Sequence, residues 1–166
     1  RARRGQDHEQ PVSVTLEEAF CGGQRILEAK GSDGKTRRLE VKIPAGVKDG
    51  SRIRMAGAGG PGAGGGPKGD LYLVISVQPH ALYQREDDDL RTELPVELTT
   101  LVLGSDLPVP TLKGTTLSLK IPPETQNGKV FRLAGQGMPV LGDATQRGDL
   151  FVQVKAVLPT NLSAKE

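Results

Sequence analysis

Leu39-Glu-Val-Lys-Ile-Pro44 is repeated as Leu117-Ser-Leu-Lys-Ile-Pro122, at an offset of 78 residues (122 − 44). Further matches follow in the same order: Gly50 with Gly128, residues 54–59 with 132–137, Gly69-Asp-Leu71 with Gly148-Asp-Leu150 and, upstream and more weakly, residues 14–22 with 96–104. Ordered matches at a nearly constant offset indicate an internal duplication. The chain of 166 residues is therefore expected to form two homologous units, each with a small core.

Within each repeat, the pattern is that of short strands separated by turns. Apolar residues alternate over 11–16 and 36–43, and 71–77 is almost continuously apolar, which predicts strands. Gly31-Ser-Asp-Gly34 tolerates positive φ and predicts a hairpin. Thr15-Leu-Glu-Glu18 has capping-box spacing and predicts one helical turn. The expected fold is mostly all-β, with two tandem homologous β-sandwich-like domains that carry one short helical turn each.

The same signals predict the domain boundaries. Residues 1–10 are interpreted as a linker remnant, 11–89 as the first domain and 90–162 as the second. Residues 57–70 consist mostly of Gly and Pro, which predicts a long mobile loop before the last strand of the first domain. Glu86-Asp-Asp-Asp89 is expected to be a solvated turn between the domains.

Composition excludes several classes of function. The 22 basic and 20 acidic residues leave a net charge of only +2, so nucleic-acid binding by counterion release has little to act on. The two tyrosines and three phenylalanines are too scattered for a base-stacking platform. No apolar segment approaches the roughly 20 residues of a membrane span. One cysteine cannot form an intrachain disulfide, which makes the reducing cytoplasm the expected location.

No constellation of residues points to catalysis or to a bound group. Gly57-Ala-Gly-Gly-Pro-Gly62 has the spelling of a dinucleotide-binding loop, but no helix can begin in the glycines and proline that follow. His8, His80 and Cys21 are too few and too dispersed for a zinc site, and Cys21 is expected to be a small packed side chain. The sequence thus predicts no catalytic residue, no metal and no cofactor. A hydrolase stays as an alternative that would need a His-centred constellation.

The repeats resemble the C-terminal domains of DnaJ-family co-chaperones. The resemblance is carried by Ile43-Pro-Ala-Gly-Val-Lys-Asp-Gly50, by Arg132-Leu-Ala-Gly-Gln-Gly-Met-Pro139 and by the Gly-Asp-Leu triplets, and it runs from about Val12 to Leu162. It implies a zinc-free member, because the cysteine-rich insertion of relatives would lie between Gly31 and Thr36. Only a hairpin is expected there.

This resemblance also implies a function without catalysis. A co-chaperone of this kind would hold unfolded polypeptide by strand addition in an apolar groove on the first domain, for delivery to a DnaK-type chaperone. By position, the groove would contain Val12, Leu27, Ala29 and Leu73. Some relatives carry aromatic residues at the last three positions, so a preference for smaller aliphatic side chains is expected here.

Partners follow from the same resemblance. No His-Pro-Asp tripeptide is present, so the J-domain that acts on the DnaK-type chaperone is not on this chain. Residues 163–166 would begin a dimerisation segment, which implies a homodimer for the full-length protein and leaves a monomer open for this chain. Docking of the partner chaperone's acidic tail on Lys35, Arg37 and Arg38 also stays open. A carbohydrate- or adhesion-type β-sandwich module is the competing class, but it should expose aromatic residues for sugar stacking.

Overall fold

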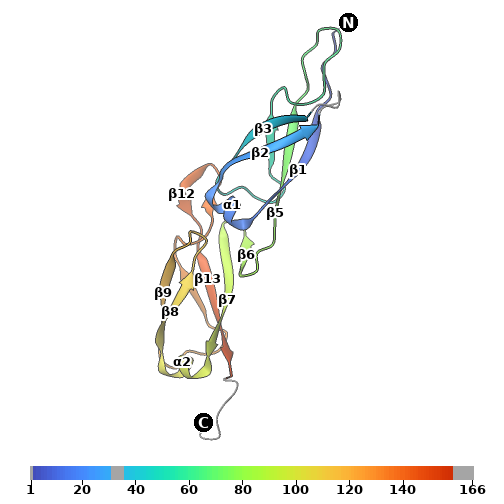
Figure 1. The fold of residues 1–166 in the computed structure, drawn as a ribbon. Coiled ribbons are helices and arrows are strands. Elements are labelled where there is room, and N and C mark those ends of the chain that lie inside the picture. The colour runs from blue at the N-terminus through green and yellow to red at the C-terminus, as the bar shows by residue number, and fades with distance from the viewer. Residues whose placement is uncertain (1, 31–35, 159–166) are drawn as a thin grey trace. The chain divides into compact units, whose positions relative to one another are not determined.

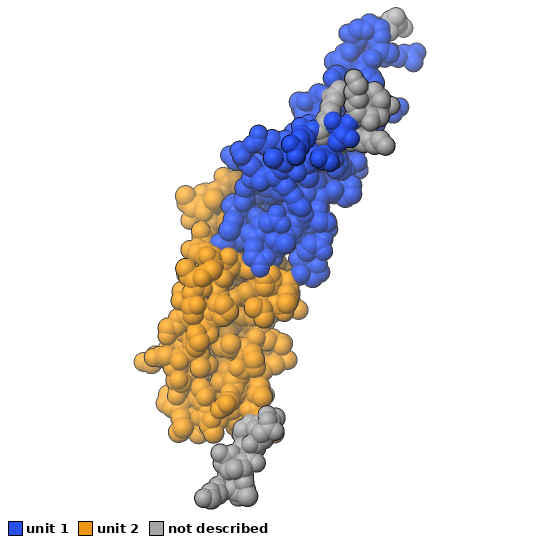
Figure 2. Space-filling model, in the orientation of Figure 1, with its two compact units in different colours: residues 1–79 blue, residues 80–166 orange. Residues whose placement is uncertain are grey.

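Strands dominate the computed structural model, which describes residues 2–30 and 36–158 (Figure 1). Two helices of six residues each are the only helices in these ranges. The chain divides into two compact units, residues 1–79 and 80–166 (Figure 2). The prediction of a mostly all-β, sandwich-like fold with one short helical turn in each unit is confirmed.

The first unit contains five strands, β1 to β5, which form two sheets. Its elements are β1 (His8–Val14), α1 (Leu16–Cys21), β2 (Gly23–Lys30), β3 (Thr36–Ile43), β4 (Arg52–Met55) and β5 (Leu71–Val77), and Figure 1 labels all of them except β4. One sheet has the order β1-β5-β4, in which β1 is parallel to β5 and β4 is antiparallel to it. The other sheet is the antiparallel pair β2-β3. The parallel pair is possible because α1 and β2 to β4 supply the long crossover that such a pair requires.

The second unit has the same plan with additions. Its elements are β6 (Tyr83–Glu86), β7 (Asp89–Glu97), α2 (Leu98–Leu103), β8 (Ser105–Pro110), β9 (Thr116–Ile121), β10 (Val130–Leu133), β11 (Pro139–Val140), β12 (Asp143–Arg147) and β13 (Leu150–Val157). Its main sheet has the order β10-β13-β7-β6, and β8-β9 and β11-β12 are separate pairs. Thus β7, β13 and β10 take the places of β1, β5 and β4.

Backbone hydrogen bonds repeat together with the topology. The amide of Gly50 donates to the carbonyl of Ile75 at 2.7 Å, and that of Gly128 donates to the carbonyl of Val154 at 2.9 Å. In both units this bond connects the turn before the short antiparallel strand to the central strand. The sequence repeat therefore corresponds to a repeated set of contacts.

The core of the first unit lies between its main sheet and the β2-β3 pair. In the first unit the buried side chains come from alternate positions: Val12 and Val14 of β1, Leu71, Leu73 and Ile75 of β5, and Val41 and Ile43 of β3, none more than 4% exposed. Burial of one such side chain contributes roughly 1.5–3 kcal/mol. Alternation with one buried face is what the sequence pattern predicts.

The predicted capping box is present at the start of α1. The Glu18 amide donates to Thr15 Oγ1 at 3.1 Å, and the Thr15 amide donates to Glu18 Oε1, also at 3.1 Å. Such a cap stabilises a helix terminus by about 1 kcal/mol. At α2 the N-cap is Glu97, whose side chain makes no capping bond.

The units divide between Pro79 and His80, whereas the sequence predicts a division between residues 89 and 90. The physical reason is the hairpin β6-β7, in which Tyr83 lies opposite Thr92 and Glu86 opposite Asp89. The acidic run is therefore the turn of a hairpin within the second unit.

The glycine-rich loop pairs with the segment that the sequence analysis interprets as a linker. Arg3 and Ala63 exchange two backbone hydrogen bonds, of 2.8 and 2.9 Å, and the Gly60 amide donates to the Gln6 carbonyl at 2.8 Å. A Cβ atom added at Gly5 would collide with the carbonyl oxygen of Gly60. Glycine here permits two backbones to touch, so residues 2–7 belong to the first unit and the loop has a bonded partner.

Membrane spanning by a helix finds no support in the described part of the chain, where neither short helix has the length or apolar character to cross a bilayer.

Candidate functional site

The four predicted groove residues lie in two different sheets. Val12 on β1 and Leu73 on β5 share the inward face of the main sheet, where Val12 lies opposite Ile75. Both are buried, with 4% and 0% of their surface exposed. Leu27 on β2 is half-buried and lies opposite Leu39 of β3. Ala29 follows on the same strand, and its side chain is outside the described part of the structure.

A ligand can therefore reach Leu27 directly, whereas Leu73 has no exposed surface in this structure. The strand that carries Leu27 pairs only with β3 among the described residues, so one edge of β2 has no strand beside it. Such an edge presents backbone donors and acceptors to an incoming strand.

Ile26 is a candidate binding residue that the sequence analysis missed. Its side chain is 64% exposed on the outer face of β2, between the exposed polar residues Gln24 and Glu28. The sequence contained a signal for Ile26, because it is an apolar residue at one of the outward positions of an alternating strand, where its side chain cannot reach the core. Leu27 and Ile26 together give this strand apolar surface on both faces.

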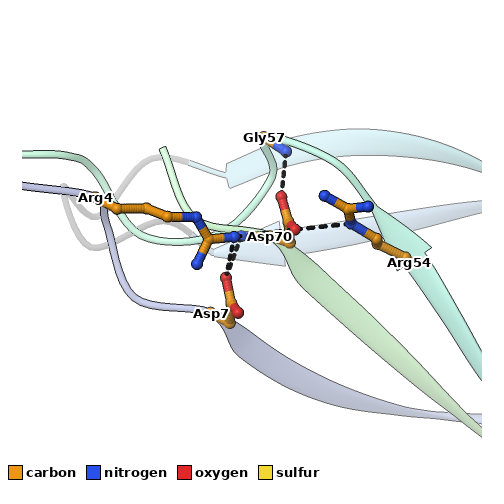
Figure 3. Close-up of polar contacts among 5 residues, drawn as sticks. All are labelled: Arg4, Asp7, Arg54, Gly57 and Asp70. Atoms are coloured by element: carbon orange, nitrogen blue, oxygen red, sulfur yellow. Dashed lines mark hydrogen bonds and ion pairs between the residues drawn. The ribbon is translucent and has the colours of Figure 1, made fainter. Parts of the chain in front are cut away.

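A second missed feature is a cluster of charges around Asp70. The Asp70 carboxylate, only 6% exposed, accepts hydrogen bonds from Arg54 Nε at 2.8 Å, Arg4 Nη2 at 3.1 Å and the Gly57 amide at 3.1 Å. Figure 3 shows the two guanidinium groups approaching it from opposite sides. The Asp70 amide in turn donates to Asp7 Oδ1 at 2.7 Å. This Asp70 cluster ties the N-terminal segment to β4 and β5.

The Asp70 cluster has a counterpart in the second unit. Asp149 accepts from Arg132 Nε at 2.6 Å and from the Gly135 amide at 3.0 Å, and its own amide donates to Asp89 Oδ1 at 2.8 Å. The repeated Gly-Asp-Leu triplets of the sequence thus mark a repeated clasp. Because the same aspartate, arginine and glycine-amide contacts recur in both units, its role is structural.

Hydrogen bonding holds the pKa of both aspartates below the ordinary value of 3.8. For Asp70 the causes are first the Gly57 amide and then Arg54, and for Asp149 they are the Gly135 amide and then Arg132. A carboxylate whose folded-state pKa is lowered stabilises the fold above its unfolded-state pKa. That stabilisation is lost as the pH falls through the folded-state value.

Asp70→Asn is therefore expected to flatten the acid dependence of the first unit. Wild-type stability should decline below about pH 4, and the variant, already less stable at neutral pH, should lose less over the same range. Hydrogen exchange of the β1 and β5 amides between about pH 6 and about pH 3 measures this. An identical decline in both proteins would contradict the assigned role of Asp70.

Groups for metal or nucleophilic chemistry are not assembled in the ranges that the structure describes. No set of three or more His, Cys, Asp or Glu side chains there could hold a metal ion. Cys21 is exposed at the end of α1, and the expectation that it is packed is wrong. It is the last helical residue, and the buried positions of this helix are Leu16, Ala19 and Phe20.

A cleft of about 500 Å³ lies on the second unit. It is lined mainly by polar or charged side chains, including His80, Arg91, Glu93 and Gln153. Arg91 lies 3.7 Å from Glu86, and Glu93 lies 3.0 Å from Lys155, so ion pairs already engage its charges. Its polarity does not match the apolar surface that an unfolded polypeptide would require.

Comparison with known proteins identifies the family. The family model described as "DnaJ C terminal domain" matches residues 8–159. The chain belongs to the DnaJ C-terminal domain family. Proteins named "Chaperone protein DnaJ" from Brucella anthropi, Brucella canis and Brucella suis are each 47% identical to it over 146 residues.

These matches cover 88% of this DnaJ-family chain and 37% of each relative's length. The chain thus spans less than half of the length of these relatives. Residues 31–35, where the zinc-binding insertion of DnaJ relatives is expected, lie outside the described residues, and so do Lys35 and residues 163–166. The register of β2 and β3 nevertheless closes with Lys30 opposite Thr36.

Proposed function

We propose that this chain is the client-holding part of a DnaJ co-chaperone. It binds extended segments of unfolded polypeptide by strand addition along β2, and it catalyses no reaction. The observation that carries this proposal is the edge of β2 that has no neighbouring strand among the described residues, next to the half-buried Leu27 and the exposed Ile26. The relatives named as chaperone proteins support it.

Binding of this kind divides affinity and selectivity between two sets of atoms. Backbone hydrogen bonds to β2 accept any sequence, whereas an apolar groove selects for apolar content. In the proposed groove Leu27 forms the rim, Val12 and Leu73 form the floor, and Ala29 belongs to the groove by its position on β2. Val12 and Leu73 then act by shaping the surface above them, because they are buried.

The proposed affinity is modest. Two or three buried aliphatic side chains of a client contribute roughly 1.5–3 kcal/mol each, from which the cost of ordering the client is deducted. A Kd in the micromolar range, equivalent to about −8 kcal/mol, is the outcome. Such weak binding suits a protein that must release its client to a DnaK-type chaperone in the cytoplasm.

Delivery to that chaperone is assigned to the longer protein, through a J-domain that this chain does not carry. A homodimer of the longer protein is also part of the proposal. An apolar patch on the second unit supports it, formed by α2 and the end of β13: Leu98, Val102, Leu103, Val157 and Leu158, which are 42–75% exposed. At the corresponding helix α1 the exposed positions include Glu17 and Glu18, so the apolar patch belongs to one unit only.

A peptide array tests the proposed function. Peptides rich in Leu, Ile and Val should bind the chain, whereas matched peptides with Ser or Asp at those positions should not. A smaller aliphatic preference predicts weaker binding of peptides in which Phe or Trp replaces Leu. Binding that is independent of apolar content, or no binding at all, would refute the proposed function.

A further inference from the structure

We infer that Pro108 and Pro110 close the edge of β8 to strand addition, so that this chain takes a client strand on β2 and not on the equivalent strand of its second unit. The inference rests on the proposed function and names two residues that determine where that function resides. The two units share a topology, so a difference in binding must come from the residues at their strand edges.

β2 and β8 are equivalent strands. Each follows a short helix and a glycine C-cap, Gly22 or Gly104, and each pairs antiparallel with a single strand in the described ranges. Gly23 lies opposite Ile43 in the first pair, and Ser105 lies opposite Ile121 in the second. At this offset of 82 residues (105 − 23), Ile26 corresponds to Pro108 and Glu28 to Pro110.

The direction of the proline nitrogens follows from one hydrogen bond beyond the strand end. The Thr111 amide donates to the Thr115 carbonyl at 2.9 Å, and these residues continue the register in which Pro110 lies opposite Thr116. In an antiparallel pair, hydrogen-bonded and non-hydrogen-bonded positions alternate. Val109 therefore bonds to β9, and the nitrogens of Pro108 and Pro110 face the opposite edge. On that edge the Pro110 carbonyl also accepts a hydrogen bond from the Tyr83 hydroxyl.

An edge with proline at alternate outward positions cannot donate to an incoming strand at those positions. Proline has no N–H, and its ring occupies the space that a client carbonyl would approach. By the equivalence of the two hairpins, the amides of Ile26 and Glu28 point outward from β2 and are available as donors. Natural proteins use edge prolines to prevent strand addition.

Side-chain burial independently supports client binding on β2 rather than on β8. Val109, the counterpart of Leu27, is 1% exposed, whereas Leu27 is half-buried. The β8 edge thus lacks both the backbone donors and an accessible apolar side chain. The two units have the same topology, but only β2 offers backbone donors together with an accessible apolar side chain, so any site on β8 should be weaker than the site on β2.

Titration of the chain with a lysine-flanked peptide of alternating Leu and Thr, as long as the 8 residues of β2, tests this inference. Isothermal calorimetry should give one site per chain. Ile26→Pro/Glu28→Pro should weaken binding about 100-fold, since two lost hydrogen bonds reduce affinity about tenfold each. The matched control Ile26→Thr/Glu28→Thr keeps both amides and should stay within about tenfold of wild type.

The reciprocal variant opens the second unit. Pro108→Thr/Pro110→Thr restores two outward amides and should add a second, weaker site, including in a chain whose β2 edge carries the two prolines. This arm decides the question even if proline on β2 disrupts folding, which circular dichroism would reveal. Two sites in the wild type, or no added site in the opened variant, would overturn the inference while leaving the proposed function intact. A wild type that binds no peptide would refute the proposed function itself, and the inference with it.

Discussion

Leu27→Asp is expected to abolish the ability of the chain to suppress aggregation of a denatured reporter protein. The half-buried Leu27 lies on β2, one edge of which has no neighbouring strand in the described ranges, so a client bound at that edge would cover a carboxylate placed there. An ion buried against apolar peptide without a counter-charge loses hydration that nothing replaces. A loss of about 3 kcal/mol or more, which is over 100-fold in affinity, would move micromolar binding beyond detection.

Gln24→Asp is the matched control for this substitution. It adds the same charge to the same strand, but at an exposed position of the outer face. Suppression of aggregation should then be retained, and circular dichroism of both variants should match the wild type. A well-folded Leu27→Asp protein that still suppresses aggregation would remove Leu27 from the groove. Loss of folding would instead assign Leu27 to the core.

Gly5→Val is expected to detach the N-terminal segment from the first unit. A Cβ atom at this position collides with the backbone of Gly60 and Pro61, which cannot move aside as a flexible side chain could. Relief of the collision breaks the pairing between residues 3–6 and the glycine-rich loop and separates Arg4 and Asp7 from Asp70. We expect a loss of about 3 kcal/mol in the stability of this segment, at the upper end of the effect of overpacking.

Ala63→Val is the control for this second prediction. It places the same valine side chain on an exposed residue of the same loop that already has a Cβ, so its effect should stay within about 0.5 kcal/mol. The Arg3 amide donates to the Ala63 carbonyl, and the Ala63 amide donates to the Arg3 carbonyl. Hydrogen exchange of these two amides therefore measures the pairing directly. Equal protection of these amides in Gly5→Val and wild type would show that the close approach is not required.

Local patterns in the sequence predicted much of the fold. The repeat predicted two homologous units, the alternation at Val12, Val41 and Ile43 predicted a buried strand face, and the capping box at Thr15 predicted α1. These features depend on residues near one another or on direct repetition, so one sequence contains the information. The exposed Ile26 and the paired prolines of β8 were also readable, once the phase of each strand was known.

Contacts between distant segments could not be read in this way. Alternation identifies Leu73 as inward-facing, but it cannot distinguish a core position from the floor of a groove, because both kinds of position take apolar side chains. Glycine composition predicts a mobile loop over residues 57–70, because it describes only the freedom of the isolated chain. The backbone partner of that loop lies more than 50 residues earlier, at Arg3 (63 − 3).

By itself, the sequence determined that this protein is a duplicated β-domain of the DnaJ C-terminal type, because the repeat and its motifs are local and ordered. Only the tertiary structure decided which apolar side chains stay exposed and which strand edges have no neighbouring strand among the described residues. Exposure and free hydrogen-bonding groups depend on which strands pair. Leu27 and Val109 occupy equivalent positions of β2 and β8, yet Leu27 is half-buried and Val109 is 1% exposed. This difference comes from the tertiary packing of each unit and is not contained in the pattern of either strand.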